Sequence, residues 1–310
     1  MNHSLIGLTL LIGWFSFSSV NGENWPQWRG PDGLGVSAET NLPTTWDSGT
    51  NILWNVSLSM RSHSSAVTWK EKIFITGSSD GLGLLAAKAL LAQDHKVFVH
   101  AKNEQRAKDL NAELPNASAV LIADLANIDE VKQLAKEVNS FGKFDAIIHN
   151  AGISSGELFN VNVLAPYMLT AEIETPNRLI YLSSSMHKGG SMLKNEAEIP
   201  NISYSDSKFL LTLLMDYVAK IYPKTYVNAV DPGWVPTKMG GQSAPDDLQK
   251  GYETQLWLAT SEEDAAKVSG KYFFHQQQQK PHSEITNTDF QQKLITICKN
   301  RSGVELSKAK

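Results

Sequence analysis

Two residues four positions apart, Tyr204 and Lys208, have side chains suited to acid–base chemistry. A helix predicted over residues 203–221 places both on one face, because residues four apart are neighbours on a helix. A free tyrosine has a pKa of about 10, and a nearby ammonium lowers that pKa by favouring the phenolate. Such a tyrosine can exchange a proton with a bound substrate. The same spacing is more often a surface pair, so the rest of the chain decides between the two interpretations.

A glycine-rich segment upstream, Thr76-Gly77-Ser78-Ser79-Asp80-Gly81-Leu82-Gly83, is suited to holding phosphate groups. It lies between a strand predicted over residues 72–76 and a helix predicted over residues 82–92. The glycines permit a tight turn and a close approach of a pyrophosphate, while the helix N-terminus supplies N–H groups and a positive dipole. The alternative is a flexible glycine turn, but the strand–loop–helix context favours a dinucleotide site. Downstream of such a site, Tyr204 and Lys208 are better explained as catalytic.

Alternating strands and helices must position these residues. Strands are predicted over residues 72–76, 96–100, 119–123, 144–149, 178–182, 226–230 and 271–274, and further helices over residues 104–113 and 128–140. Strands separated by helices imply right-handed crossovers and a parallel sheet. The predicted fold class is therefore α/β, a Rossmann-like doubly wound parallel sheet, preceded by a short irregular or β N-terminal arm. Four consecutive glutamines at 276–279 are predicted to form a solvated loop.

With these elements in place, the glycine spacing resembles the short-chain dehydrogenase/reductase family over residues 72–275. Three further segments carry the resemblance: Asp124-Leu125 after the third strand, Asn150-Ala151-Gly152 after the fourth, and the Pro-Gly loop Asp231–Thr237 after the sixth. The resemblance implies hydride transfer between a nicotinamide cofactor and a small to medium carbonyl or alcohol. The cofactor-binding residues that it implies are Gly77, Ser79, Asp80, Gly81, Leu82, Gly83, Lys102, Arg106, Asp124, Leu125, Asn150, Ala151, Gly152, Tyr204, Lys208, Pro232, Gly233, Val235 and Thr237.

The resemblance also implies four catalytic residues: Tyr204, Lys208, Ser184 and Asn162. Tyr204 would protonate the carbonyl oxygen during reduction and act as the base in the reverse direction. Ser184 is chosen from three consecutive serines, 183–185, as the hydroxyl that holds the substrate oxygen. Asn162 would hold a water in a proton relay to Lys208, with Asn160 as the alternative. His and Cys spacing suggests no metal site.

The end of the second predicted strand bears on the choice between NADP and NAD. An NAD site offers an acid to the ribose, whereas NADP needs positive charge for the extra phosphate. Here the strand is followed by Lys102 and Arg106 and contains no acid. This favours NADP, with NAD as the alternative, because Asp80 stands where many NADP-dependent members have a basic residue. A solvated helix start is the other explanation for Lys102 and Arg106.

One departure from the family concerns the twelve residues that separate Asn150 from Asn162. The family has a longer connection here, beside the nicotinamide pocket. A shortened helix would misplace Asn162 or open the site to water, and small displacements cost much rate. The sequence therefore also admits a catalytically impaired fusion product that binds a dinucleotide weakly or not at all.

The N-terminal segment has a different character, since six of the eight tryptophans lie in the first 69 residues. Residues 1–22 resemble a secretory signal peptide, with an uncharged apolar run and a small-residue end. Residues 23–71, which begin Glu23-Asn24-Trp25-Pro26-Gln27-Trp28-Arg29-Gly30-Pro31, resemble the start of quinoprotein-like β-propeller proteins, but only one blade's worth is present. Residues 276–310 are assigned to a C-terminal tail or helix.

Composition limits the partners of the 310-residue chain. A formal charge of −4 argues against a nucleic-acid surface. No membrane contact is expected apart from an uncleaved N-terminal segment, and a homo-oligomer is consistent with the family. The single cysteine, Cys298, excludes an intrachain disulfide. The compartment stays open, because the N-terminal signal indicates export and the dehydrogenase domain indicates the cytoplasm.

Overall fold

The computed structural model describes residues 71–307 and, before them, only Arg29, residues 34–36 and Thr45. The predicted signal peptide lies outside the described residues, and so does nearly all of the predicted propeller-like segment. The elements below all belong to one compact unit, Glu71–Lys310. Within the described part of the chain, no helix combines the length and apolar character that crossing a bilayer requires.

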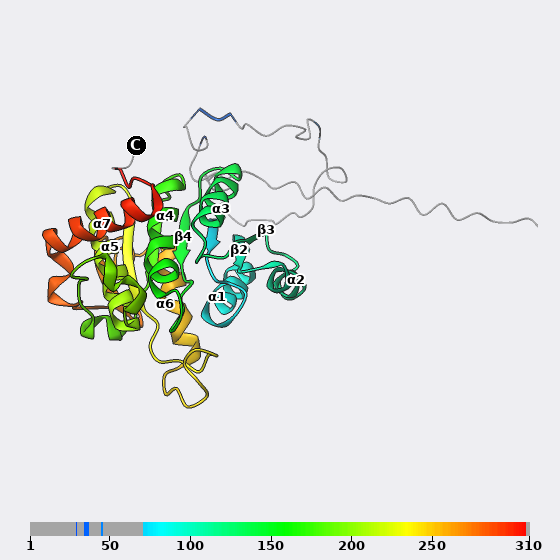
Figure 1. Ribbon diagram of the computed structural model, residues 1–310. Helices are drawn as coiled ribbons and strands as arrows, with labels where there is room; N and C mark the ends of the chain where they lie inside the picture. The colour runs from blue at the N-terminus through cyan, green and yellow to red at the C-terminus, as the bar shows by residue number, and fades with distance from the viewer. Residues whose placement is uncertain (1–28, 30–33, 37–44, 46–70, 308–310) are drawn as a thin grey trace, which may run out of the picture. The chain divides into compact units, whose positions relative to one another are not determined.

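The described residues form one eight-stranded sheet (Figure 1). Its strands are β1 (Lys72–Ile75), β2 (Lys96–Ala101), β3 (Ala119–Ile122), β4 (Ala146–His149), β5 (Arg178–Leu182), β6 (Tyr226–Asp231), β7 (Lys271–Phe274) and β8 (Gln277–Gln279). Their spatial order is β3-β2-β1-β4-β5-β6-β7-β8, and the first seven run parallel. This confirms the predicted doubly wound parallel sheet.

Helices follow the strands along the chain (Figure 1). They are α1 (Gly81–Ala92), α2 (Glu104–Glu113), α3 (Ile128–Ser140), α4 (Ala165–Glu172), α5 (Tyr204–Ile221), α6 (Leu248–Thr260) and α7 (Thr288–Ser302). Short helical turns connect them: η1 (Asn160–Leu164), η2 (Ser185–Gly189), η3 (Glu196–Asn201) and η4 (Ser283–Thr286).

Alternation along the strands builds two hydrophobic cores, one on each face of the sheet. In β1, Phe74 packs into the core that contains α3, α4, α5 and α7. Its neighbours Ile73 and Ile75 pack into the core that contains α1, α2 and α6. Successive side chains on a strand point to opposite faces, so a strand covered on both faces is apolar throughout. Both faces of the sheet are therefore covered by helices, so residues that bind a ligand must come from the loops at the strand ends.

The prediction for residues 276–279 was wrong, because Gln277–Gln279 form the edge strand β8 instead of a loop. β8 runs antiparallel to β7, and the turn that joins them has positive φ at His275 (47°) and Gln276 (62°). Two consecutive positive φ values are typical of the tight turn that closes a two-residue hairpin. All three β8 residues are exposed, so polar side chains are compatible with this edge position.

The sheet reverses its direction of growth between β1 and β4. From β1 the chain adds β2 and β3 on one side, and from β4 it adds β5, β6 and β7 on the other. In open α/β sheets, ligands bind outside the carboxyl ends of the strands at such a reversal. The loops after β1 and β4 are the glycine-rich segment and the segment that begins with Asn150, so both lie at this point.

Candidate active site

A cavity of about 670 Å³ opens at the carboxyl ends of the strands. Its size is that of a ligand-binding pocket. Most of the residues predicted to bind a dinucleotide line its wall. They are Gly77, Ser79, Asp80, Gly81, Leu82, Lys102, Arg106, Asp124, Leu125, Asn150, Ala151, Gly152, Tyr204, Lys208, Pro232 and Thr237. One cavity thus brings together the glycine loop and the Tyr204–Lys208 pair.

The glycine loop is shaped by close backbone approaches. Gly77 has a φ of 63°, and a Cβ there would lie 2.8 Å from Cα of Ala151. A Cβ on Gly83 would lie 2.4 Å from Nδ2 of Asn150. Gly83 does not line the cavity but lies beneath the loop, where only a glycine fits. The first and last glycines are therefore required by packing, whatever ligand binds above them.

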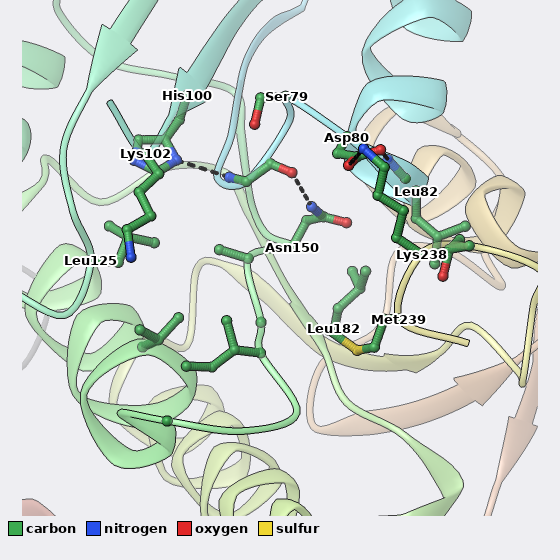
Figure 2. Close-up of a pocket in the computed structure, with 18 of the residues that line it drawn as sticks. Ser79, Asp80, Leu82, His100, Lys102, Leu125, Asn150, Leu182, Lys238 and Met239 are labelled. Carbon is green, nitrogen blue, oxygen red and sulfur yellow. Dashed lines mark hydrogen bonds and ion pairs between the residues drawn. The ribbon is translucent and has the colours of Figure 1, made fainter. Parts of the chain in front are cut away.

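Asn150 ties the loops after β1 and β4 together (Figure 2). Its Nδ2 donates to the backbone oxygens of Thr76 (2.9 Å) and Gly77 (3.0 Å). The N–H of Ala151 donates to Oγ1 of Thr76 at 3.1 Å. These bonds hold the floor of the cavity in one conformation, so the sequence prediction that placed Asn150 and Ala151 at the site has a clear structural counterpart.

His100 at the end of β2 also holds the glycine loop, and the sequence analysis did not identify it. Its Nδ1 accepts from the N–H of Gly77 at 3.0 Å, and its Nε2 donates to the backbone oxygen of Ala123 at 3.0 Å (Figure 2). Burial lowers the pKa of His100 to about 4, so the ring is neutral at physiological pH. A polar residue in an otherwise apolar strand was the available sequence signal.

Positive charge gathers beside the end of β2. Lys102 and Arg106 are exposed and line the cavity. Lys102 Nζ lies 3.1 Å from Oδ2 of Asp124, and Figure 2 shows Lys102 among the residues that line the cavity. Asn103 caps α2 by accepting from the N–H of Arg106 at 3.0 Å. This cap starts the helix so that both basic side chains stand at the rim.

Asp80 starts helix α1 and forms an ion pair with Lys238, a second residue absent from the sequence prediction. Its Oδ1 accepts from the N–H of Gly81 at 2.8 Å. Burial raises the pKa of Asp80, but the bonds from Lys238 and Gly81 outweigh it and the pKa falls below its ordinary value. Lys238 and Lys102 lie on opposite sides of the glycine loop in Figure 2. Each of these two lysines is paired with a carboxylate, Lys238 with Asp80 and Lys102 with Asp124.

Helix α5 presents Tyr204 and Lys208 because it begins at Tyr204. Ser203 and Asp206 form a reciprocal cap, in which Ser203 Oγ accepts from the N–H of Asp206 at 3.0 Å. Such a cap defines where a helix starts. Lys208 is 3% exposed, and its Nζ donates to the backbone oxygen of Leu182 at 2.7 Å and lies 5.6 Å from the Tyr204 ring centre.

Burial shifts the pKa values of both side chains away from their ordinary values. The pKa of Lys208 is lowered to about 8 by burial, against which the carboxylate of Asp231 acts. The pKa of Tyr204 is raised to about 12 by burial and by Asp231, while a hydrogen bond with Ser184 lowers it. At neutral pH the arrangement therefore holds a protonated phenol beside an ammonium.

Ser184 is the serine of the three that hydrogen-bonds with Tyr204. Ser183 Oγ instead pairs with Oγ1 of Thr212 at 2.7 Å, inside the core, and Ser185 begins η2. Ser184 Oγ also accepts from the N–H of Met186 at 3.2 Å. Of the three serines, Ser183 lines the cavity, whereas Ser184 is not part of its wall but interacts with the Tyr204 phenol.

Asn162 lies in a π-helical turn, η1, and is fully buried. Its Oδ1 accepts from the N–H of Ile153 at 2.9 Å, while its Nδ2 donates to Ile153 O and to Ser207 Oγ, both at 2.9 Å. The short connection from Asn150 therefore leaves Asn162 next to α5. Its amide holds Ile153 and Ser207 and so anchors the loop after β4 to α5, while its predicted contact with a relay water stays a prediction.

The loop after β6 contributes fewer residues than predicted. Pro232 and Thr237 are part of the cavity wall, whereas Gly233 and Val235 are not. Val235 is buried and packs against α6, where a Cβ on Gly251 would lie 2.8 Å from its Cγ1. Motif matching cannot tell which alternate residues of a loop face the ligand, because that depends on the helix packed behind it.

The residues present fit a dinucleotide. A Cβ on Gly152 would lie 3.1 Å from Lys208 Nζ, so the glycine keeps space open in front of the ammonium. Gly81 has a φ of 53°, a left-handed conformation that favours glycine at this point of the loop. Within the described residues, no group of three or more His, Cys, Asp or Glu side chains is arranged to hold a metal ion.

Comparison with known proteins gives a consistent result. The family model described as short chain dehydrogenase matches residues 71–248. Short-chain dehydrogenase chyC of Penicillium rubens is 38% identical over 255 residues, covering 76% of this chain and 98% of that protein. Short-chain dehydrogenase chry4 of Gibberella zeae is 36% identical with the same coverage. A short chain dehydrogenase of Shigella flexneri, solved in complex with NADP, is 25% identical, with a TM-score of 0.53 and coverage of 67% and 98%.

Proposed function

This chain belongs to the short-chain dehydrogenase/reductase family, and we propose that it is an NADP-dependent oxidoreductase acting on a small to medium carbonyl or alcohol. One observation carries the proposal. Tyr204 and Lys208, one helical turn apart, line the same cavity as the glycine loop, and Ser184 hydrogen-bonds with the Tyr204 phenol. An acid, a neighbouring cation and a second hydroxyl at one point are what protonation of a carbonyl oxygen needs.

The choice of NADP rests on charge. Lys102 and Arg106 line the cavity at the end of β2, in a position suited to a ribose phosphate. Bound there, NADP(H) supplies the hydride that passes between its nicotinamide ring and the carbonyl carbon. The relative from Shigella flexneri, which was solved with NADP, supports the same choice. Asp80 does not oppose it, because Lys238 balances its charge.

Tyr204 acts as the proton donor in the reducing direction. Because its pKa is raised to about 12, the phenol keeps its proton at neutral pH and has it available for the substrate oxygen. Ser184 donates a second hydrogen bond to that oxygen and so fixes its position.

Lys208 supports the phenol from the buried side. Its pKa of about 8 leaves it mostly charged at pH 7, and an ammonium near a phenolate stabilises the negative charge that forms after proton transfer. Asn162 holds Ile153 and Ser207, and Ser207 is the residue before Lys208. The amide of Asn162 thus fixes the start of α5 against the loop after β4.

The experiment uses the full-length chain in two steps. Titration with NADPH and then NADH, followed by quenching of protein fluorescence, should give saturable and tighter binding for NADPH. NADPH oxidation with a panel of aliphatic and aromatic aldehydes and ketones should then reveal turnover. Saturable binding without turnover on any member of the panel would support a catalytically impaired protein. No saturable binding of either nucleotide would reject the proposal.

A further inference from the structure

Asp231, the last residue of β6, is a carboxylate buried close to the candidate catalytic pair. It is 5% exposed. Its Oδ2 accepts from the hydroxyl of Tyr272 at 3.0 Å, and its Oδ1 accepts from the N–H of Gly233 at 3.0 Å. Both donors are neutral. Burying a charge is costly unless an opposite charge lies nearby. We therefore ask which cationic side chain lies near the Asp231 carboxylate.

The register of the sheet places Asp231 and Lys208 at the same strand ends. Val230 pairs with Leu182, and the N–H of Ser183 donates to the backbone oxygen of Val230 at 2.7 Å. Asp231 therefore follows directly on the point where β5 ends. The ammonium of Lys208 reaches that point too, because it donates to the backbone oxygen of Leu182 at 2.7 Å.

The carboxylate acts through space on both members of the pair. It raises the pKa of Lys208, which burial alone would lower further. It also adds to the effect of burial in raising the pKa of Tyr204. The two effects have one electrostatic origin, since a negative charge favours the ammonium and disfavours the phenolate.

The other titratable side chains that interact with Asp231 are His187 in η2 and Tyr272 in β7. His187 is fully buried, and burial lowers its pKa. Its Nδ1 donates to the backbone oxygen of Ser184 at 2.7 Å, while its Nε2 accepts from the N–H of His282 at 3.0 Å. Burial also raises the pKa of Tyr272. Both side chains are therefore neutral at physiological pH, which leaves Asp231 and Lys208 as the charges of this group.

We propose that Asp231 is a positioning residue whose negative charge keeps the buried Lys208 ammonium charged beside Tyr204. The two hydrogen bonds from Tyr272 and Gly233 hold the carboxylate in the orientation that this requires. The inference deepens the proposed function and rests on it for its catalytic consequence. The electrostatic coupling between Asp231 and Lys208, on which the inference depends, can be tested without measuring turnover.

The first test measures stability against pH in the absence of nucleotide. Lys208 has a folded pKa of about 8, below the ordinary lysine value of 10.5. Between these pH values the unfolded chain binds more protons at Lys208, so its contribution to stability increases as pH rises through this window and is lost as pH falls back through pH 8. In Asp231→Asn this increase should begin at a pH lower by about one unit. The Asp231→Asn shift should vanish when Lys208→Met is also present.

Tyr272→Phe provides the matched control. It removes one hydrogen bond to the carboxylate but leaves the charge, so the onset of the stability increase should stay where it is in the wild-type chain. If Asp231→Asn and Tyr272→Phe behave alike, or if the Asp231→Asn shift persists in the Lys208→Met background, the charge coupling is refuted and Asp231 is only a packing residue.

The second test reads the same coupling through catalysis. In Asp231→Asn the alkaline limb of carbonyl reduction should move to lower pH by about one unit, because both pKa values fall when the negative charge is removed. A lower kcat with an unmoved pH midpoint would contradict the proposal. If the wild-type chain shows no turnover, the proposed function fails, and the stability measurement alone decides the role of Asp231.

Discussion

The two ends of the cavity differ in how they hold their charges. At the end beside β2, Lys102 and Arg106 are exposed, and Lys102 shares its charge with Asp124 at the rim. At the other end, Lys208 is 3% exposed, and Asp231, which lies behind the cavity wall, is 5% exposed. The charged side chains at the first end are thus exposed to solvent, whereas Lys208 and Asp231 are shielded from solvent.

From this difference we expect the exposed side chains to act in nucleotide binding and the buried side chains in proton transfer. Exposed charges can meet a phosphate with little loss of hydration, but solvent screens them and each contributes modestly. Buried charges act over short distances in a poorly polarisable medium, so they shift one another's pKa values strongly. Substitutions at the buried end should therefore affect rate and pH dependence, whereas those at the exposed end should affect nucleotide affinity.

Tyr204→Phe tests the buried end most directly. Loss of the proton donor should lower turnover by roughly 10²–10⁴-fold, with NADPH affinity changed less than about twofold, because the phenylalanine keeps the packing of the ring. Steady-state kinetics and fluorescence titration measure the two quantities. Tyr217→Phe on the same helix is the control and should behave like the wild type. Retained turnover in Tyr204→Phe would show that another group donates the proton.

His100 links the two ends, since it holds the glycine loop from the core. Its folded pKa of about 4 lies below the ordinary value of 6.5. Its contribution to stability is therefore present above pH 6.5 and is lost as pH falls toward 4. Urea unfolding at pH 7 and pH 5 should show a loss of about 2 kcal/mol from this residue, which is absent in His100→Gln.

A histidine in the core, His149, provides a control that distinguishes loss of the glycine-loop contact from loss of core stability. Burial also lowers the pKa of His149 to about 3, and its Nε2 pairs with Oγ1 of Thr170 in the core. His149→Gln should change the acid sensitivity in the same direction while leaving NADPH affinity as in the wild type. His100→Gln should weaken NADPH binding, because Gly77 loses its partner. Equal NADPH affinity in both variants would show that His100 does not support nucleotide binding.

Lys102→Ala tests the exposed end. Loss of one charge-assisted contact to the ribose phosphate should raise the Kd for NADPH by about tenfold and leave the Kd for NADH nearly unchanged. The effect should shrink at high salt, because exposed charges are screened. Lys108→Ala is the control, since Lys108 is an exposed lysine on helix α2, which follows Lys102 in the chain. An equal loss for both nucleotides would mean that Lys102 does not meet the ribose phosphate.

Lys238→Ala should have the smallest effect. Its pair with Asp80 is largely exposed, and such pairs contribute about 1 kcal/mol or less. We expect NADPH affinity to fall by about two- to fivefold, measured by titration at low salt, because Asp80 then adds uncompensated negative charge beside the glycine loop. Lys250→Ala on α6 should leave the affinity unaltered. A gain of affinity in Lys238→Ala would mean that this pair closes the cavity against the cofactor.

Local motifs were the part of the site that sequence reasoning could reach. The glycine loop, the Tyr204–Lys208 spacing and the capped start of α5 depend on neighbours within a few residues, so their types and spacing carry the information. The identification of Ser184 among three serines used the family pattern. In each case a strand or helix of predictable type presents the residue.

Contacts between distant segments were out of reach. Lys238 meets Asp80 across 158 residues, and Tyr272 meets Asp231 across 41. Strand β8 forms because a tight turn brings residues 277–279 to the edge of the sheet. A run of four glutamines does not predict either feature. The engagement of the Asn162 amide by Ile153 and Ser207 depends on how the chain crosses from β4 to α5.

Local spacing and periodicity were enough to identify the family, the alternation of strands and helices, and the residues that could carry acid–base and dinucleotide chemistry. Which of these residues share a cavity, and which charges are buried, could be seen only in the folded chain. Burial, and with it the pKa of Tyr204 and Lys208, is a property of the packed sheet and helices and not of any one segment. For that reason Asp231, seen in the sequence only as the start of a Pro-Gly loop, could be proposed as a partner of the candidate catalytic pair only from the fold.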